Sequence, residues 1–150
     1  MRRRSVVLAA CALLLIRAEA AAQVTTLRNL AFGTIPSGTT TSVSKNSANS
    51  AQWRFTGTFT LGGSFALTLP TALTGPGTAI PITFSTSDGQ RNTTNNPSGG
   101  TSFNPNNSQS VALLFSGTVY VWLGASISPP LNQTPGSYSA SVVLTTTGML

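Results

Sequence analysis

The clearest pattern along the chain is an alternation of apolar and polar residues, and it is strongest over residues 52–61. There the odd-numbered positions are Trp, Phe, Gly, Phe and Leu, while the even-numbered positions are Gln, Arg and Thr. A period of two predicts a half-buried β-strand with its aromatic side in the core. A Gly-Gly pair follows at 62–63, and a second alternating segment covers 64–69. We therefore predict that these two segments form a β-hairpin.

The segment 117–147 predicts two further strands joined by a turn-rich connection. Residues 117–123 carry apolar bulk on both faces, which is typical of a strand in the interior of a sheet. From residue 137 onward, apolar residues alternate with hydroxyl residues, so one face should be buried and the other should meet water. The apolar face of this last strand comprises Tyr138, Ala140, Val142 and Leu144, with a turn at Gly136 before it.

The segment 85–110 has a different composition, rich in Asn, Ser and Gly, with Phe103 as its single large apolar residue. Such a stretch cannot form a core of its own, so the sequence predicts a long surface loop pinned by Phe103. A loop of this length is either a binding element or disordered. If it binds a ligand, the candidate residues are Asp88, Arg91, Asn95, Asn96 and Phe103.

Shorter apolar segments near residues 24–35, 80–84 and 111–115 bring the expected number of strands to about seven, and no helical period follows residue 22. Strands separated by Gly, Pro and Asn turns indicate an all-β fold. We predict one domain over residues 23–150, an immunoglobulin-like antiparallel β-sandwich.

Residues 1–22 have the three parts of a secretory signal peptide: three arginines, an apolar run over 6–16, and small residues over 18–22. The apolar run is well short of the roughly 20 residues that cross a bilayer as a helix, so no permanent membrane span is expected. We expect export to the periplasm, the cell surface or an extracellular appendage. An alternative is acylation at Cys11 as in a bacterial lipoprotein, which is disfavoured because apolar residues follow the cysteine where a polar tether is usual.

Few charged groups follow the leader. Four cations, Arg28, Lys45, Arg54 and Arg91, and one acid, Asp88, give a net charge of 4 − 1 = +3. The cations are scattered along the sequence, so no nucleic acid partner is expected.

Residues 23–150 contain no His, Glu or Cys. A Ser-His-Asp triad, a pair of catalytic carboxylates and a zinc site therefore all lack the residues they require. A Ser-Lys dyad using Lys45 is chemically possible, but a solvated lysine in a polar segment is the simpler interpretation. We expect no enzymatic activity, no metal and no cofactor.

Three short motifs carry a resemblance to a known family: Leu-Ala-Phe-Gly at 30–33, the aromatic strand ending at 62–63, and Pro-Gly-Ser-Tyr at 135–138 before the alternating C-terminal strand. The chain resembles bacterial secreted proteins of the fimbrial-subunit and spore coat protein U type, and is most similar to a related group of uncharacterised secreted domains. The resemblance implies a pilin-like sandwich. In chaperone-assembled pilins the sandwich is incomplete and an extended strand from a neighbour completes it.

The resemblance also implies partners and an assembly strand. The partners would be further copies of this chain or other subunits, joined by strand addition, and a periplasmic chaperone. The assembly strand would contain Gly136, Tyr138, Ala140, Val142 and Leu144.

Two hypotheses for function follow from these patterns. The first is a non-enzymatic exported structural protein, either a fimbria-like or pilus-like surface appendage subunit or a coat subunit. The alternative is a secreted ligand-binding module or adhesin that recognises a glycan or a surface through the Asn-rich loop 85–110.

Overall fold

The computed structural model describes residues 23–58, 63–111 and 116–147, and within these ranges the chain forms twelve strands and no helix. The predicted signal peptide, residues 1–22, and the alternative acylation site at Cys11 lie outside the described residues. The strands are β1 (Gln23–Arg28), β2 (Thr41–Val43), β3 (Ala51–Thr58), β4 (Gly63–Thr68), β5 (Ala72–Leu73), β6 (Ile80–Thr83), β7 (Gly89–Asn92), β8 (Thr101–Phe103), β9 (Gln109–Val111), β10 (Ser116–Leu123), β11 (Ala125–Ile127) and β12 (Val143–Thr147).

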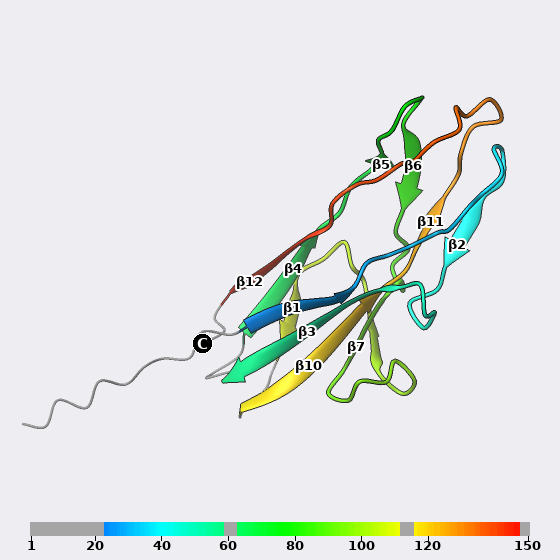
Figure 1. Ribbon diagram of the computed structural model, residues 1–150. Helices are drawn as coiled ribbons and strands as arrows, with labels where there is room; N and C mark the ends of the chain where they lie inside the picture. The colour runs from blue at the N-terminus through cyan, green and yellow to red at the C-terminus, as the bar shows by residue number, and fades with distance from the viewer. Residues whose placement is uncertain (1–22, 59–62, 112–115, 148–150) are drawn as a thin grey trace, which may run out of the picture.

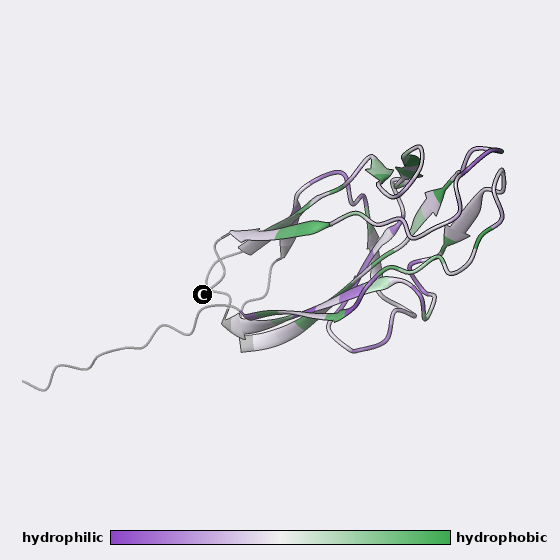
Figure 2. Cartoon of the chain, turned by 45° about the horizontal axis from the view of Figure 1, so that its top comes forward, coloured by the Kyte–Doolittle hydropathy of each residue, from purple (hydrophilic) through white to green (hydrophobic). Residues whose placement is uncertain are grey.

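The strands form three antiparallel sheets (Figure 1). The largest has the order β1-β3-β10-β7-β8, and the sheet β12-β4-β9 faces it as a second layer (Figure 2). A third sheet, β2-β11-β6-β5, extends the molecule away from the end where β12 finishes (Figure 1). The predicted all-β antiparallel sandwich is confirmed. The number of strands exceeds seven because strands of two or three residues are too short to show alternation.

The main core lies between β3 and β10 in one layer and β4 in the other. Phe65 of β4 is at its centre: its ring centroid is 5.5 Å from that of Phe55 and 5.4 Å from that of Phe103, the latter in a T-shaped arrangement. Val119 and Val121 of β10 complete the buried layer. Edge-to-face and tilted aromatic contacts of this kind stabilise a core beyond simple area burial.

Strand β10 is an interior strand, as predicted, because it pairs with β3 on one side and with β7 on the other. On one face of β10, the side chains of Val119, Val121 and Leu123 point into the core. Trp122, which lies between the last two in the sequence, points to the opposite face and is also almost completely buried. The core face of β10 is therefore fully covered, and its opposite face is covered at Trp122.

The predicted hairpin between residues 52–61 and 64–69 is wrong. Strand β3 pairs with β1 and β10, whereas β4 pairs with β12 and β9, so the two strands lie in different sheets. Both strands carry aromatic residues on one face, and placing them in opposite layers brings Phe55 into contact with Phe65. Burying these rings between the two layers stabilises the fold by more free energy than one short hairpin turn would contribute. Residues 59–62 of the predicted turn lie outside the described residues.

The segment 85–110 is not a structureless loop. It contains β7, β8 and the start of β9, and β7 pairs with β8 in the register Gly89↔Phe103 to Arg91↔Thr101. Phe103 does anchor the segment, because its ring is buried in the core. The prediction failed because strands made mostly of polar residues can form backbone hydrogen bonds with each other. Such strands have no alternating apolar positions by which the sequence would show them.

The C-terminal segment shows the predicted alternation of exposed and half-buried residues, but it does not form one continuous strand. Ser139 pairs with Thr74 as an isolated bridge, and β12 begins only at Val143, where it pairs with Thr68 of β4. Val142 and Leu144 are half-buried against the core, while Ser137, Ser139, Ser141 and Thr145 are exposed, as predicted for the hydroxyl face.

Replacing Phe65 by Ala should destabilise the protein by about 3–5 kcal/mol, because it removes two ring contacts and leaves a cavity between the layers. Chemical denaturation followed by circular dichroism measures this change. Thr145→Ala, on the exposed face of β12, is the control and should change stability by less than about 0.5 kcal/mol. Equal effects of the two substitutions would contradict the core described here.

Candidate functional site

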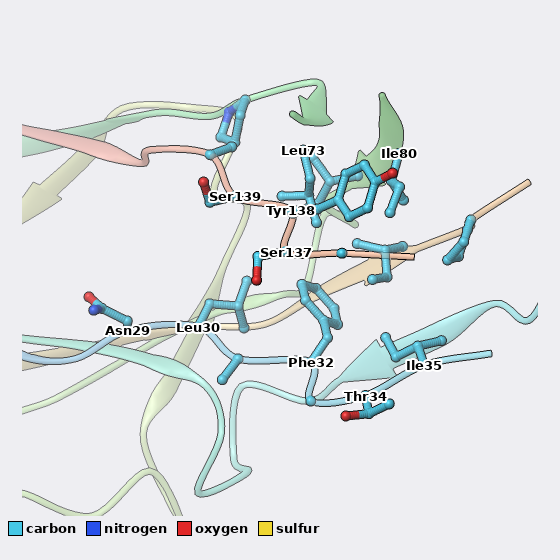
Figure 3. A pocket seen from close by; sticks show the side chains of 18 of the residues that line it. Asn29, Leu30, Phe32, Thr34, Ile35, Leu73, Ile80, Ser137, Tyr138 and Ser139 are labelled. Atoms are coloured by element: carbon cyan, nitrogen blue, oxygen red, sulfur yellow. The ribbon is translucent and has the colours of Figure 1, made fainter. Parts of the chain in front are cut away.

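An open groove of about 950 Å³ runs along one side of the sandwich. Its two walls are extended segments, residues 29–37 after β1 and residues 135–142 before β12. Figure 3 shows Leu30 and Phe32 on the first wall and Ser137 and Tyr138 on the second, and all four line the groove. The floor is apolar and comprises side chains from several strands and loops: Ala51, Trp53, Leu73, Ile80, Ile82 and Ile127.

The first wall is fixed from its outer side. Arg28, the last residue of β1, donates from Nε to the Ser50 carbonyl at 2.8 Å and from Nη2 to Ser50 Oγ at 3.1 Å and to the Ser47 carbonyl at 3.4 Å. Three residues later, the Ala31 N–H donates to the Asn49 carbonyl at 3.0 Å. The turn at 47–50 therefore holds this wall in place from the side away from the groove.

The second wall is fixed to the loops of the third sheet. The backbones of Ser139 and Thr74 exchange two hydrogen bonds of 2.9 Å, and the Tyr138 hydroxyl donates to the Thr134 carbonyl at 2.8 Å. The Tyr138 ring lies so close to Gly75 that a Cβ there would be 2.5 Å from the ring. Gly136 has a φ of 153°, and a Cβ on it would lie 2.4 Å from Pro76. Glycine is therefore required at both close approaches.

Backbone groups on both walls point into the groove. In an extended chain, the N–H and C=O of one residue point to one side and those of the next residue to the other. Ala31 bonds to Asn49 and Ser139 to Thr74, so in such a chain the neighbouring residues Leu30, Phe32 and Ala140, which line the groove, would direct their backbone groups to the other side. Within the described residues, no hydrogen bond engages the backbones of these three. The groove thus has two unpaired edges above an apolar floor.

The residues of the predicted assembly strand all lie on the second wall or at its end. Tyr138 packs against the apolar cluster around Ile80 and Ile82, while Val142 and Leu144 pack against the main core. Ala140, between them, is exposed beside the groove. Gly136 sets the position of the wall, as described above.

The five candidate residues of the Asn-rich segment are each engaged within the fold. Asp88 Oδ2 accepts from the Ser85 N–H at 2.7 Å, and Arg91 Nη1 donates to the Ser110 carbonyl at 2.6 Å. Asn95 Oδ1 accepts from Gln52 Nε2 at 2.6 Å, and the Asn96 carbonyl accepts from Asn92 at 2.7 Å. Phe103 faces the core. These residues therefore belong to different surroundings rather than to one shared pocket.

A feature that sequence reasoning missed is the cover over Trp122, which is 1% exposed. Gln52 and Gln90 are the cross-strand partners of Trp122, and both are buried. Gln52 binds Asn95, and Gln90 Nε2 donates to the Pro97 carbonyl at 2.8 Å, so both glutamines beside Trp122 hold the turn at 93–100 to this face of the sheet. The only signal in the sequence was a glutamine on the polar side of each strand.

In the part of the chain that the structure describes, no group of three or more His, Cys, Asp or Glu side chains is close enough to hold a metal ion. Nor does that part of the chain contain a helix long and apolar enough to span a membrane.

Comparisons with known proteins assign no family. No family model matches the chain, and no curated protein or solved structure does so either.

Gln90→Ala should destabilise the protein by about 1–3 kcal/mol, because it leaves the Pro97 carbonyl and Ser102 Oγ without their amide partner. The cover over Trp122 should loosen, giving a red shift in tryptophan emission and faster hydrogen exchange over 93–100. Asn107→Ala is the matched control, because Asn107 is exposed and its side chain makes no hydrogen bond among the described residues. An unchanged emission spectrum in Gln90→Ala would contradict the role given to this turn.

Proposed function

We propose that the protein is a non-enzymatic exported structural subunit, of a surface appendage or a coat, and that copies of it join by strand addition. The observation that supports this most strongly is the groove with an unpaired backbone edge on each wall. An extended segment of a second copy would pair with these edges while its side chains cover the apolar floor. The signal-peptide pattern at 1–22 supports the export part of the proposal.

The chemistry of the walls favours a peptide strand over an apolar small molecule. An acyl chain would cover the floor but would leave the backbone groups of Leu30, Phe32 and Ala140 without partners. Burying such groups unpaired costs about 1–3 kcal/mol each. A peptide strand offers donors and acceptors on both of its edges at the same two-residue spacing as the walls.

Uneven burial across the β1–β3 pair supports the same conclusion. Val24 of β1 is the cross-strand partner of Phe55 of β3, so both side chains lie on the core face of the sheet. Phe55 is 1% exposed, whereas Val24 is 39% exposed. The apolar layer is therefore uncovered toward this edge, and a further strand would extend its cover.

The resemblance described above supplies the remaining parts of the proposal. A periplasmic chaperone would occupy the groove before assembly, and a neighbouring subunit would replace it. In this scheme the wall containing Gly136, Tyr138 and Ala140, continued by Val142 and Leu144, is the assembly strand.

The test removes one backbone donor from the groove edge without disturbing the monomer. Ala140→Pro deletes an N–H that lines the groove and forms no hydrogen bond among the described residues, and Ala140 is exposed and outside the β-ladders. We expect Ala140→Pro to fold but to form far fewer multimers, measured by sedimentation velocity and by SDS-resistant ladders from exporting cells. Ala140→Ser keeps the N–H and should assemble like the unchanged protein.

Two results would contradict the proposal. One is a protein that stays monomeric at all concentrations and leaves the surface of exporting cells unchanged when its gene is deleted. The other is normal assembly of Ala140→Pro. If Ala140→Pro does not fold, Phe32→Glu, which puts a charge into the half-buried wall of the groove, replaces it as the assembly-deficient variant.

A further inference from the structure

A second surface of interest is the outer face of the β1-β3-β10-β7-β8 sheet, meaning the face directed away from the core. Tyr120 lies in the middle of this face, directly between Arg54 of β3 and Asn92 of β7. Val119 and Val121 on either side of it are buried in the core, so Tyr120 points outward. It is half-buried and therefore presents part of its ring to solvent.

The Tyr120 ring is held in a fixed orientation. It stacks on Trp122 with a centroid separation of 6.1 Å and an interplanar angle of 28°. Trp122 is itself almost completely buried, and its cross-strand partners Gln52 and Gln90 are hydrogen-bonded to the turn at 93–100. A rigid aromatic surface loses little entropy when a ligand packs on it.

Arg54 places a positive charge beside this ring. Its side chain is half-buried, and its Nε atom is shielded from solvent without a hydrogen-bond partner among the described residues. Asp88 is the only acidic residue after position 22, and its carboxylate accepts from the Ser85 N–H. Because the shielded Nε atom cannot be reached from solvent, a ligand would bind the terminal Nη atoms, and an anionic ligand would give this guanidinium group a charge partner that it lacks among the described residues.

Uncharged hydrogen-bonding groups surround the pair. Thr25 of β1 is the cross-strand partner of Arg54 on the far side from Tyr120. The next outward row of the sheet contains Gln23, Thr56 and Thr118, which are cross-strand partners of one another in that order. The outer face thus combines one aromatic ring, one guanidinium group and several hydroxyl and amide groups.

We propose that this face binds an acidic polysaccharide, with a uronic acid carboxylate on Arg54 and a sugar ring on Tyr120. A planar guanidinium group binds a carboxylate through two parallel hydrogen bonds. The negatively polarised face of an aromatic ring attracts the C–H groups of a pyranose, and the threonine hydroxyls match its hydroxyl groups. An open sheet surface suits an extended polymer, because small molecules are usually enclosed in concave sites. A single cation is too few for a nucleic acid.

This proposal does not depend on strand addition, because the outer face and the groove lie on different sides of the sheet. The experiment measures binding of the purified protein to an oligogalacturonate and to a neutral galactan oligosaccharide of similar length by isothermal titration calorimetry. We expect binding of the acidic oligosaccharide only. Arg54→Gln should weaken it about tenfold or more, the usual effect of losing a charge-assisted hydrogen bond.

Two further variants separate a specific site from general charge attraction. Lys45→Gln removes the same charge, but Lys45 binds Ser102 on β8, three strands away from β3, so it should leave affinity nearly unchanged. Tyr120→Leu keeps an apolar side chain but removes the ring face, and should weaken binding as Arg54→Gln does. Circular dichroism and thermal melting establish that each variant is folded.

Three outcomes would overturn the proposal: no binding of the acidic oligosaccharide, equal affinity for the neutral one, or equal losses from Lys45→Gln and Arg54→Gln. If Tyr120→Leu does not fold, the comparison of Arg54→Gln with Lys45→Gln decides the question alone.

Discussion

The hydrogen-bonding requirement of the backbone is the constraint on which this structure depends. A strand edge presents N–H and C=O groups that need partners, and proteins usually cover or twist such edges. Here Arg28 and Ala31 hold one wall of the groove to the turn at 47–50, and Ser139 holds the other to Thr74. Each wall is therefore paired on one side only. The two walls face one another over apolar side chains, so the proposed strand addition would satisfy backbone groups and cover apolar surface at the same time.

Hydrogen bonds from polar side chains order parts of this fold that ion pairs and apolar burial order in many other domains. In the segment 85–110, Asn side chains accept from the backbone two residues onward, as Asn92 does from Thr94, Asn96 from Ser98 and Asn104 from Asn106. These local bonds fix turns without any apolar contact. Because they form within a few residues, an Asn-rich and charge-poor segment can be well ordered. Its composition alone suggested a loop.

The alternation of apolar and polar residues predicted correctly which side chains face the core, but it did not predict which strands pair with each other. It placed Phe55, Val121 and Val142 on the core side correctly, because burial of alternate side chains leaves a direct trace in the sequence. It paired 52–61 with 64–69 wrongly, since a Gly-Gly turn is compatible with a change of sheet as well as with a hairpin. The groove could not be predicted, because Leu30 and Tyr138 come together only through the sandwich. Gln52 and Gln90 gave no signal either, since a strand's polar face normally meets water.

The Arg28 side chain also determines how the molecule would carry a mechanical load. Strand β1 is joined to β3 by a ladder from Gln23 to Arg28, and three hydrogen bonds from the guanidinium group secure its last residue to Ser47 and Ser50. A force applied to the N-terminal end along the strand axis would stretch the ladder in shear, so its bonds would have to break together. Tension would then pass to the turn at 47–50 before it reached the groove wall, and the wall would keep its shape while the chain is pulled.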